Sequence, residues 1–578
     1  MTPNVHFSSE EDCRSLPAYF RNTGDTREAV ICKTEGAWPE WLSGTFVRTS
    51  GGSWTIPLSE DGSKPSAQLQ HFFDGLGVLH KFEFNDGEVK YISRSTADGL
   101  IRKAKEQGFL KALVFGLNPN TALEDAQDPC WAKFGKQACL SPVQSIFLPS
   151  NESAEPDEYN VNVVPRRGFH VAANGNPNNR GKPAAKPEEE EIIIGSDVNV
   201  LQICDAKTLE PKRLFTWAAI DPELNGFGIC AHPVKDRQRH HIYNYLISEQ
   251  GVMYVFAVDY ASNPAKLVWK TALPCRPCYI HSLAISQEYC IFIRNPLHMD
   301  TSDVSKPASQ MLTTEPGEKT LFFVIQKTTG TLVATYAAPN FLFFHSVNAY
   351  DYIDQGTGFK NVHVDLISYD GASCPFLEFN FSNLLSPGGP FTDGTLIRYE
   401  LSGVNALPKF SETQRRATVA QMMPNCPIEL PRINKFYSCN PSYRYVWGII
   451  ESGGTAPGTL VPLAKLSNGI SHPSCAFSAG IAKADWQTGK VEIWRPENGE
   501  SAPCEPVFIG RPGASDEDDG ITLTIVVNRE GSHSTLVALD GKTLAEVARA
   551  SMPQVYGMGP HGSFIEKPGL YSQADMNP

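Results

Sequence analysis

Short strand-forming segments recur along almost the whole chain, and this pattern constrains the fold more than any other feature. Runs rich in Val, Ile, Thr, Tyr and Phe alternate with clusters of Gly, Asp, Asn and Pro, the residues that β-turns require. Few segments show the 3.6-residue period of an amphipathic helix. Strand signals at this density favour an all-β sandwich, barrel or propeller. The predicted strands include residues 44–49, 78–84, 89–93, 191–195, 241–248, 252–259, 289–294, 320–326, 362–369, 395–401, 445–451, 490–494 and 521–527.

The remaining segments suggest one domain with a few additions. Residues 99–117 carry apolar side chains at helical spacing and form the main predicted helix. Residues 174–190 and 452–469 have the composition of surface insertions, and residues 1–35 form a predicted N-terminal extension. Because no linker divides the chain, we predict that residues 1–578 form a single domain.

Charge and composition exclude several classes of protein. The net charge of −13 argues against a nucleic-acid partner, which needs a positive surface. The first residues lack the pattern of a secretory signal, and no run of 18 apolar residues could span a bilayer. The 14 cysteines are scattered as in a reducing compartment. Cys275 and Cys278 form one CxxC, without the second pair that a zinc site needs. We therefore expect a cytoplasmic protein.

Four histidines lie in short strings that combine a histidine with a local structural signal. Taken singly, a histidine beside aromatic residues is more often a core residue than a metal ligand. Gaps of 49, 64 and 216 residues between them differ from the close pairs of local metal motifs. The strings are Cys230-Ala231-His232-Pro233, Tyr279-Ile280-His281-Ser282, Phe343-Phe344-His345-Ser346 and Pro560-His561-Gly562-Ser563.

These strings are similar to the four-histidine signatures of the carotenoid cleavage oxygenase family. Further motifs match the family in the same order over about residues 36–570. The insertions and the C-terminal sequence look most like those of fungal members. Chance agreement of several ordered motifs is improbable. The additional motifs are Gly36-Ala37-Trp38-Pro39-Glu40-Trp41-Leu42-Ser43-Gly44, His71-Phe72-Phe73-Asp74-Gly75, Asp197-Val198-Asn199, Glu505-Pro506-Val507-Phe508 and Asp516-Glu517-Asp518-Asp519-Gly520.

The resemblance implies a seven-bladed β-propeller with a cap of helices and loops over its top face. One Fe(2+) would lie on the propeller axis, held by inner strands, which explains the long sequence gaps between its ligands. Imidazole suits iron, and four neutral imidazoles leave the metal its full charge and open positions. The implied ligands are His232, His281, His345 and His561.

The family also implies carboxylates that accept hydrogen bonds from three ligand imidazoles and fix their tautomers. The matching positions are Glu429, Glu505 and Asp197. The family usually has Glu where Asp197 stands, and the shorter side chain predicts a weaker, water-mediated or rearranged contact. His71 and His80 lie in a family motif without a metal role, so we interpret both as structural.

The implied substrate is a lipophilic polyene, which requires an apolar tunnel, together with O2. By motif position the tunnel lining includes Phe115, Ser196, Phe344, Tyr369 and Pro560. A segment with bulky apolar residues and lysines resembles the family's insertion at the tunnel mouth, and it predicts peripheral contact with an internal membrane. The predicted membrane contacts are Trp131, Phe134, Ile146 and Phe147.

These features predict a non-haem iron dioxygenase that cleaves a conjugated C=C bond of a carotenoid or apocarotenoid, such as β-carotene or torulene, into two carbonyl products. Ser95 stands where stilbene-cleaving members place a Tyr, which favours the carotenoid. The alternatives are cleavage of a stilbene or phenylpropene, isomerisation and hydrolysis of a retinyl ester, and lipid binding by a propeller without catalysis. No protein acid or base is required beyond the metal ligands, and the sequence does not predict the oligomeric state.

Overall fold

The computed structural model gives the fold of most of the chain. The described residues are 20–111, 115–116, 155–169, 191–248, 250–299, 311–315, 317–371, 379–381, 394–406, 415–450, 480–497, 500, 503–528 and 531–567. The predicted insertions at 174–190 and 452–469 lie outside them, as do residues 1–19 and the predicted membrane contacts Trp131, Phe134, Ile146 and Phe147.

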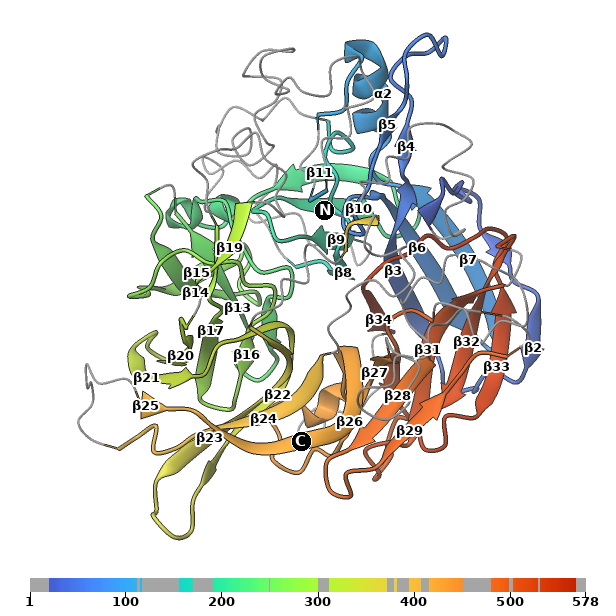
Figure 1. Cartoon of the computed structure of the whole chain (residues 1–578). Helices are drawn as coiled ribbons and strands as arrows, with labels where there is room; N and C mark the ends of the chain where they lie inside the picture. The colour runs from blue at the N-terminus through green and yellow to red at the C-terminus, as the bar shows by residue number, and fades with distance from the viewer. Residues whose placement is uncertain are drawn as a thin grey trace.

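Five four- or five-stranded sheets and one seven-stranded sheet, which β26 divides into two, form seven blades around a central axis within this part of the chain (Figure 1). Blade 1 contains, from the rim to the axis, β1 (Val30–Ile31), β7 (Glu88–Ser95), β6 (Leu76–Asn85), β3 (Gly44–Ser53) and β34 (Gly562–Glu566). Blade 2 contains β11 (Pro211–Phe215), β10 (Leu201–Asp205), β9 (Glu191–Gly195) and β8 (Val164–Arg167). Blade 3 contains β15 (Lys266–Ala272), β14 (Met253–Asp259), β13 (His241–Ile247) and β12 (Val234–Asp236).

Blades 4 to 7 continue the ring in sequence order. Blade 4 contains β25 (Arg415–Arg416), β21 (Leu332–Ala338), β20 (Thr320–Gln326), β17 (Tyr289–Arg294) and β16 (Ala284–Ile285). Blade 5 contains the first part of β26 (Thr418–Arg432), β24 (Thr395–Leu401), β23 (Lys360–Asp370) and β22 (Phe341–Ile353). Blade 6 contains β29 (Val491–Trp494), β28 (Gly480–Asp485), β27 (Tyr445–Ile450) and the second part of β26. Blade 7 contains β2 (Thr34–Gly36), β33 (Glu546–Ser551), β32 (Ser534–Asp540), β31 (Gly520–Val527) and β30 (Val507–Gly510).

One strand and the two ends of the chain join neighbouring blades. β26 pairs with β24 through residues up to Pro427 and with β27 from Ile428 onward, so one strand belongs to blades 5 and 6. The ring closes where β3 pairs with β34, and where β2 pairs with β33. The blue and red strands therefore lie side by side in Figure 1. The β21–β25 pair is parallel, whereas the other blade pairs are antiparallel.

Apolar strands fill the spaces between the blades. All six residues of β17 and all eight of β31 are buried, as expected for strands covered on both faces. Trp447 of blade 6 stacks on Phe508 of blade 7 with ring centroids 4.1 Å apart. Such aromatic pairs stabilise neighbouring sheets through a large buried area. The hydrophobic core is thus distributed between blades around the ring.

The predicted strands coincide closely with the observed ones. Residues 191–195, 289–294, 320–326 and 395–401 match β9, β17, β20 and β24 at both ends. The prediction of an all-β propeller is confirmed, whereas its cap and the single-domain assignment stay predictions. β1 and β2 show that part of the predicted N-terminal extension contributes edge strands to blades 1 and 7.

The predicted helix 99–117 is too long. α2 spans Asp98–Gln107 and ends at Gly108, whose φ of 78° is left-handed and whose N–H donates to the Ala104 carbonyl. This is the usual glycine termination of a helix, and the apolar spacing beyond it did not reveal the stop. No helix in the described part of the chain is long and apolar enough to cross a membrane.

The smaller elements lie outside the blades. Two hairpins are formed by β4 (Thr55–Ile56) with β5 (Ala67–Gln68), and by β18 (Leu297–Met299) with β19 (Leu312–Thr314). The short 3-10 helices are η5 (Trp217–Ala219), η6 (Pro222–Leu224) and η7 (Lys435–Tyr437).

Candidate metal centre

Four blades each bring one histidine to the axis. His232 and His281 lie just before the innermost strands β12 and β16, and His561 directly precedes β34. His345 lies within β22, the innermost strand of blade 5. The three other blades bring carboxylates, Asp197 after β9, Glu429 in β26 and Glu505 just before β30. Residues far apart in sequence therefore meet because each blade contributes one of them.

The four imidazoles are arranged around one point. One ring nitrogen from each lies within 4.8 Å of the others. The Nε2 atoms of His232 and His561 are 2.9 Å apart. Two nitrogens bound at about 2.1 Å and at right angles around one metal would be about 3.0 Å apart. The spacing is therefore that of neighbouring ligands of a single ion.

Two glutamates contact the Nδ1 atoms of two of these imidazoles. Glu429 Oε2 lies 2.6 Å from His345 Nδ1, and Glu505 Oε1 lies 2.9 Å from His561 Nδ1. Each contact is made when Nδ1 carries the proton and donates, which leaves the Nε2 lone pair free to bind a metal. Arg432 binds both carboxylate oxygens of Glu505 at 2.9 Å. The tautomers that a metal requires are thus fixed by buried carboxylates.

Asp197 contacts its histidine directly, although it is shorter than glutamate. Its carboxylate oxygens lie 3.1 and 3.2 Å from His281 Nδ1, the longest of the three carboxylate contacts. The Tyr279 hydroxyl donates to Asp197 Oδ2 at 2.8 Å, and the Ala231 N–H donates to Oδ1 at 3.1 Å. Asp197 is therefore held by two further donors, and its contact with His281 is direct but longer than the two glutamate contacts.

The surroundings keep two of the imidazoles, those of His232 and His561, neutral. Burial, followed by repulsion from the neighbouring histidines, holds the pKa of His232 and of His561 well below the ordinary value. Burial would raise the pKa of Glu429, but His345 and the Leu430 N–H, among its other partners, hold it below its usual value. Neutral imidazoles are the form that binds a metal, and carboxylates are the form that accepts their Nδ1–H groups.

The residues present fit a metal ion. His345 Nε2 is buried and has no hydrogen-bond partner among the described residues. A buried ring nitrogen whose lone pair has no partner costs free energy of folding, unless a bound metal ion takes up the lone pair. An all-imidazole set suits iron, zinc, copper or nickel rather than magnesium or calcium. Metal binding by these four residues stays a prediction that this geometry supports.

A second group of possible ligands is less suitable. His298, Glu315 and Glu318 lie together at the β18–β19 hairpin. Glu318 also contacts Arg294, and Glu315 contacts Arg276. These arginines already balance the carboxylates, so the group is an ion-pair network.

The predicted tunnel residues occupy different positions relative to the centre. Phe344 is buried with its ring centroid 5.9 Å from that of His281. Pro560 precedes His561, and its carbonyl accepts a hydrogen bond from Arg48 at 3.4 Å. Phe115 packs on the His71 ring with centroids 5.5 Å apart. The tunnel itself stays a prediction.

Two predicted tunnel residues also have polar partners. The Tyr369 hydroxyl donates to Glu429 Oε1 at 2.7 Å, and this supports the partner of His345. Ser196 is buried next to Asp197 and its hydroxyl contacts the backbone of Val198.

Tyr279 and Arg432 were not found from the sequence. Tyr279 lies two residues before His281, a spacing that places two side chains on one face of an extended segment. That spacing could have identified it. Arg432 follows Glu429 by three residues but pairs with Glu505 of another blade, and no local pattern predicts such a contact.

His71 and His80 make hydrogen bonds with hydroxyl and backbone groups, as structural residues do. His80 is fully buried between the Ser50 and Tyr91 hydroxyls, each at 2.8 Å, and burial lowers its pKa to about 3. His71 Nδ1 accepts the Phe73 N–H at 3.2 Å.

A family model and individual relatives place this chain in the same family. The model of the family described as Retinal pigment epithelial membrane protein matches residues 19–566. A torulene dioxygenase of Gibberella fujikuroi is 25% identical over 586 residues, covering 96% of this chain and 94% of the relative. A carotenoid dioxygenase of Neurospora crassa is 26% identical over 612 residues, covering 95% of this chain and 90% of the relative.

Solved structures share the fold. Cobalt-substituted Synechocystis ACO gives a TM-score of 0.68 at 18% identity, covering 96% of this chain and 99% of that structure. A lignostilbene dioxygenase of Pseudomonas brassicacearum also gives 0.68 at 18% identity, covering 98% and 100%. Because the family model spans most of its length, this chain belongs to the Retinal pigment epithelial membrane protein family, the carotenoid oxygenases that its motifs resemble.

Proposed function

We propose that this protein is a non-haem iron(II) dioxygenase that cleaves a conjugated C=C bond of a carotenoid or apocarotenoid into two carbonyl products. The observation that carries the proposal is the convergence of four imidazoles, three of them in contact with carboxylates. The torulene and carotenoid dioxygenases among its relatives support a polyene of the torulene or β-carotene type.

The protein residues hold the metal and shape its surroundings. Fe(2+) bound there supplies the capacity to activate O2 for addition to the double bond. His232, His281, His345 and His561 would hold the ion. Glu429, Glu505 and Asp197 keep the Nδ1 proton on three of them, so the Nε2 lone pairs point to the axis.

Apolar residues beside the centre orient the substrate and exclude water. Phe344 lies against His281, and its ring also packs on Tyr369 with centroids 5.9 Å apart. A polyene offers almost no polar group, so an apolar wall beside the metal positions it by shape. We assign no proton-transfer residue, because addition of O2 across a double bond needs none.

The proposal includes contact with the lipid that dissolves the substrate. Trp131, Phe134, Ile146 and Phe147 would touch an internal membrane from the cytoplasmic side. A flotation assay tests this part separately. Replacement of Trp131 and Phe134 by Ser is expected to reduce binding to lipid vesicles and leave iron content unchanged.

Product analysis tests the chemistry. Protein purified without oxygen and loaded with iron is incubated in air with β-carotene, torulene, apocarotenals and resveratrol. We expect carbonyl products from a carotenoid or apocarotenoid. Turnover of resveratrol alone would identify a stilbene oxygenase, and no turnover of any compound by iron-loaded protein would contradict the proposal.

Removal of one ligand tests the metal site independently of activity. His281→Ala is expected to lose the stoichiometry of about one iron per chain while the thermal transition of the propeller persists. His533→Ala, which changes an exposed histidine, is the matched control and should retain its iron. Normal iron content in His281→Ala would rule out the proposed site.

A further inference from the structure

A cavity of about 1020 Å³ lies among the innermost strands and reaches two of the four histidines, His232 and His345. His232, His345 and Glu505 line its inner end. Its wall comes mainly from the innermost strands β8, β12, β16, β22, β26 and β34, which surround the centre of Figure 1. The wall residues follow the histidines along these strands, whereas Phe344 and Pro560 precede them and do not line the cavity. None of the five predicted tunnel residues lines this cavity.

The cavity wall is rich in positive charge. Among the described residues, the wall contains two carboxylates, those of Glu505 and Glu566. Each of them is paired with a basic residue that also lines the cavity. Arg432 binds Glu505, and Lys435 contacts Glu566. The other basic residues of the wall are Arg166, Arg167, Lys235, Arg237 and Lys567.

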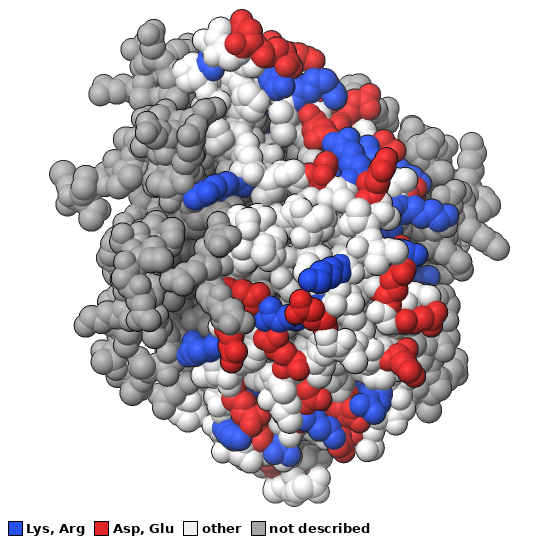
Figure 2. Space-filling model, turned by 90° about the vertical axis from the view of Figure 1, so that its right-hand side faces the viewer, with Lys and Arg blue, Asp and Glu red and all other residues white. Residues whose placement is uncertain are grey.

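This charge contrasts with the rest of the protein. The chain carries a net charge of −13. On the outer face shown in Figure 2, acidic and basic side chains are interspersed, without a large area of one sign. The basic wall is thus a local feature. Walls of low dielectric constant around charges of one sign concentrate the field within a cavity.

Arg166 lies at the inner part of the cavity and has an unused hydrogen-bond donor. Its Nη2 donates to the Ala231 carbonyl at 2.8 Å, next to His232. Its Nε is buried and has no hydrogen-bond partner in the described part of the chain. Burial lowers the pKa of Arg166 to about 10, which leaves the guanidinium charged at neutral pH. A buried donor of a cationic group that has no partner is costly unless an anion accepts its hydrogen bond.

Lys235 shows that the basic groups are close enough to repel one another. Its ammonium lies 4.1 Å from the centre of the Tyr260 ring. Burial, followed by repulsion from Arg237, Arg167 and Arg166, lowers the pKa of Lys235 to about 8. An anion between these groups would replace repulsion by attraction.

We propose that this axial cavity binds a phosphate-class anion through Arg166, Lys235 and the neighbouring arginines. Arginine matches the tetrahedral oxygens of phosphate through paired donors, and lysine adds a point charge. A free phosphate ester or a lipid phosphate headgroup would present the same chemistry. His232 and His345 line the cavity, so its occupant would lie next to the candidate metal centre.

Equilibrium dialysis of iron-loaded protein against radiolabelled inorganic phosphate tests the site. We expect saturable binding that Lys235→Gln weakens about tenfold or more, because a hydrogen bond to a charged group is lost. Arg167→Gln is a second variant, on another exposed wall residue, and it should also weaken binding. Lys266→Gln, an exposed lysine on β15, is the matched control and should bind like the unchanged protein.

Two further measurements, of the melting temperature and of binding to lipid vesicles, complete the test. Phosphate should raise the melting temperature more than sodium chloride of equal ionic strength. Sedimentation with vesicles of phosphatidic acid, compared with phosphatidylcholine, separates a lipid headgroup from a free phosphate through the same Lys235 dependence. Equal phosphate binding by both cavity variants and the unchanged protein would overturn the proposal, because phosphate would then be bound at the metal or elsewhere.

Discussion

At the scale of single residues, the centre depends on buried pairs that fix ring orientation. The three carboxylates differ in how they are held. Arg432 binds Glu505 through both oxygens, Tyr369 supports Glu429, and Tyr279 supports Asp197. The longer contact between Asp197 and His281 is thus accompanied by a hydroxyl group, that of Tyr279, which donates to the aspartate. The aspartate departs from the family pattern without losing contact with its histidine.

Glu429→Gln is expected to weaken metal binding without removing a ligand. The amide cannot accept the His345 Nδ1–H as strongly as a carboxylate, and such changes typically cost about 10–100-fold in metal affinity. Competition with a chromogenic chelator measures the affinity. Glu492→Gln, at a partly exposed position on β29, is the control. Unchanged affinity in Glu429→Gln would show that this carboxylate does not support the site.

The sequence predicted the four candidate ligands and their three carboxylate partners, but not the groups that hold those carboxylates. The four histidines were identified because each lies in a short ordered motif. Arg432 and Tyr369 act on partners from other strands, and such contacts exist only after the blades have closed into a ring. The stop of α2 at Gly108 was also missed, since apolar spacing continued past it.

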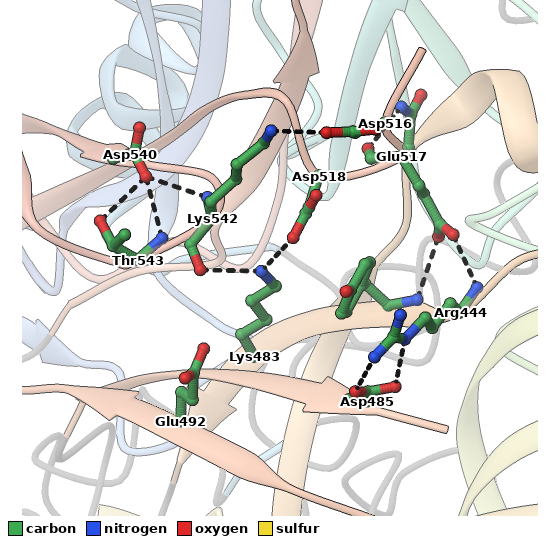
Figure 3. A network of polar contacts seen from close by, with 12 residues as sticks. Arg444, Lys483, Asp485, Glu492, Asp516, Glu517, Asp518, Asp540, Lys542 and Thr543 are labelled. Carbon is green, nitrogen blue, oxygen red and sulfur yellow. Dashed lines mark hydrogen bonds and ion pairs between the residues drawn. The ribbon is translucent and has the colours of Figure 1, made fainter. Parts of the chain in front are cut away.

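At the scale of elements, contacts between blades hold the ring together. Figure 3 shows polar contacts that join the loop before β31 to the start of β27 and to the middle of β28. Glu517 accepts the backbone N–H groups of Arg444 and Tyr445 at 2.8 and 3.0 Å. Lys483 contacts Asp518 at 2.6 Å. These contacts lie at the junction of blades 6 and 7.

The Glu517 contact predicts a pH dependence of stability. Burial raises the pKa of Glu517 from 4.5 to about 7. The folded state therefore binds more protons than the unfolded state between these values, so this group lowers the free energy of unfolding as pH rises through that window. Glu517→Gln should show a smaller decline between pH 4.5 and 7 in urea titrations. Identical pH profiles would contradict this assignment.

The stacked pair between blades 6 and 7 predicts a large stability effect. Trp447 is fully buried against Phe508. Trp447→Ala should destabilise the fold by about 3–5 kcal/mol, since a large buried ring is removed. Calorimetry measures the shift, and Trp447→Phe should retain much of the stability. Ile353→Ala, at a half-exposed position, is the control, and an equal effect there would contradict the role of the stack.

At the scale of the whole molecule, the ring explains why residues remote in sequence form one site. The density of strands predicted an all-β fold, and ordered motifs predicted the propeller. Periodicity did not reveal the blade number, because the blades differ in sequence and β26 passes from one blade to the next. Closure through β3 and β34 brings His561 beside His232 at the axis.

The most direct test of the central claim is the origin of the oxygen in the products. Iron-loaded protein is supplied with a cleaved carotenoid and isotopically labelled O2, and both carbonyl products are analysed promptly by mass spectrometry. A dioxygenase predicts one labelled oxygen atom in each product. Products that form without O2, or that carry no label after correction for exchange with water, would contradict the account.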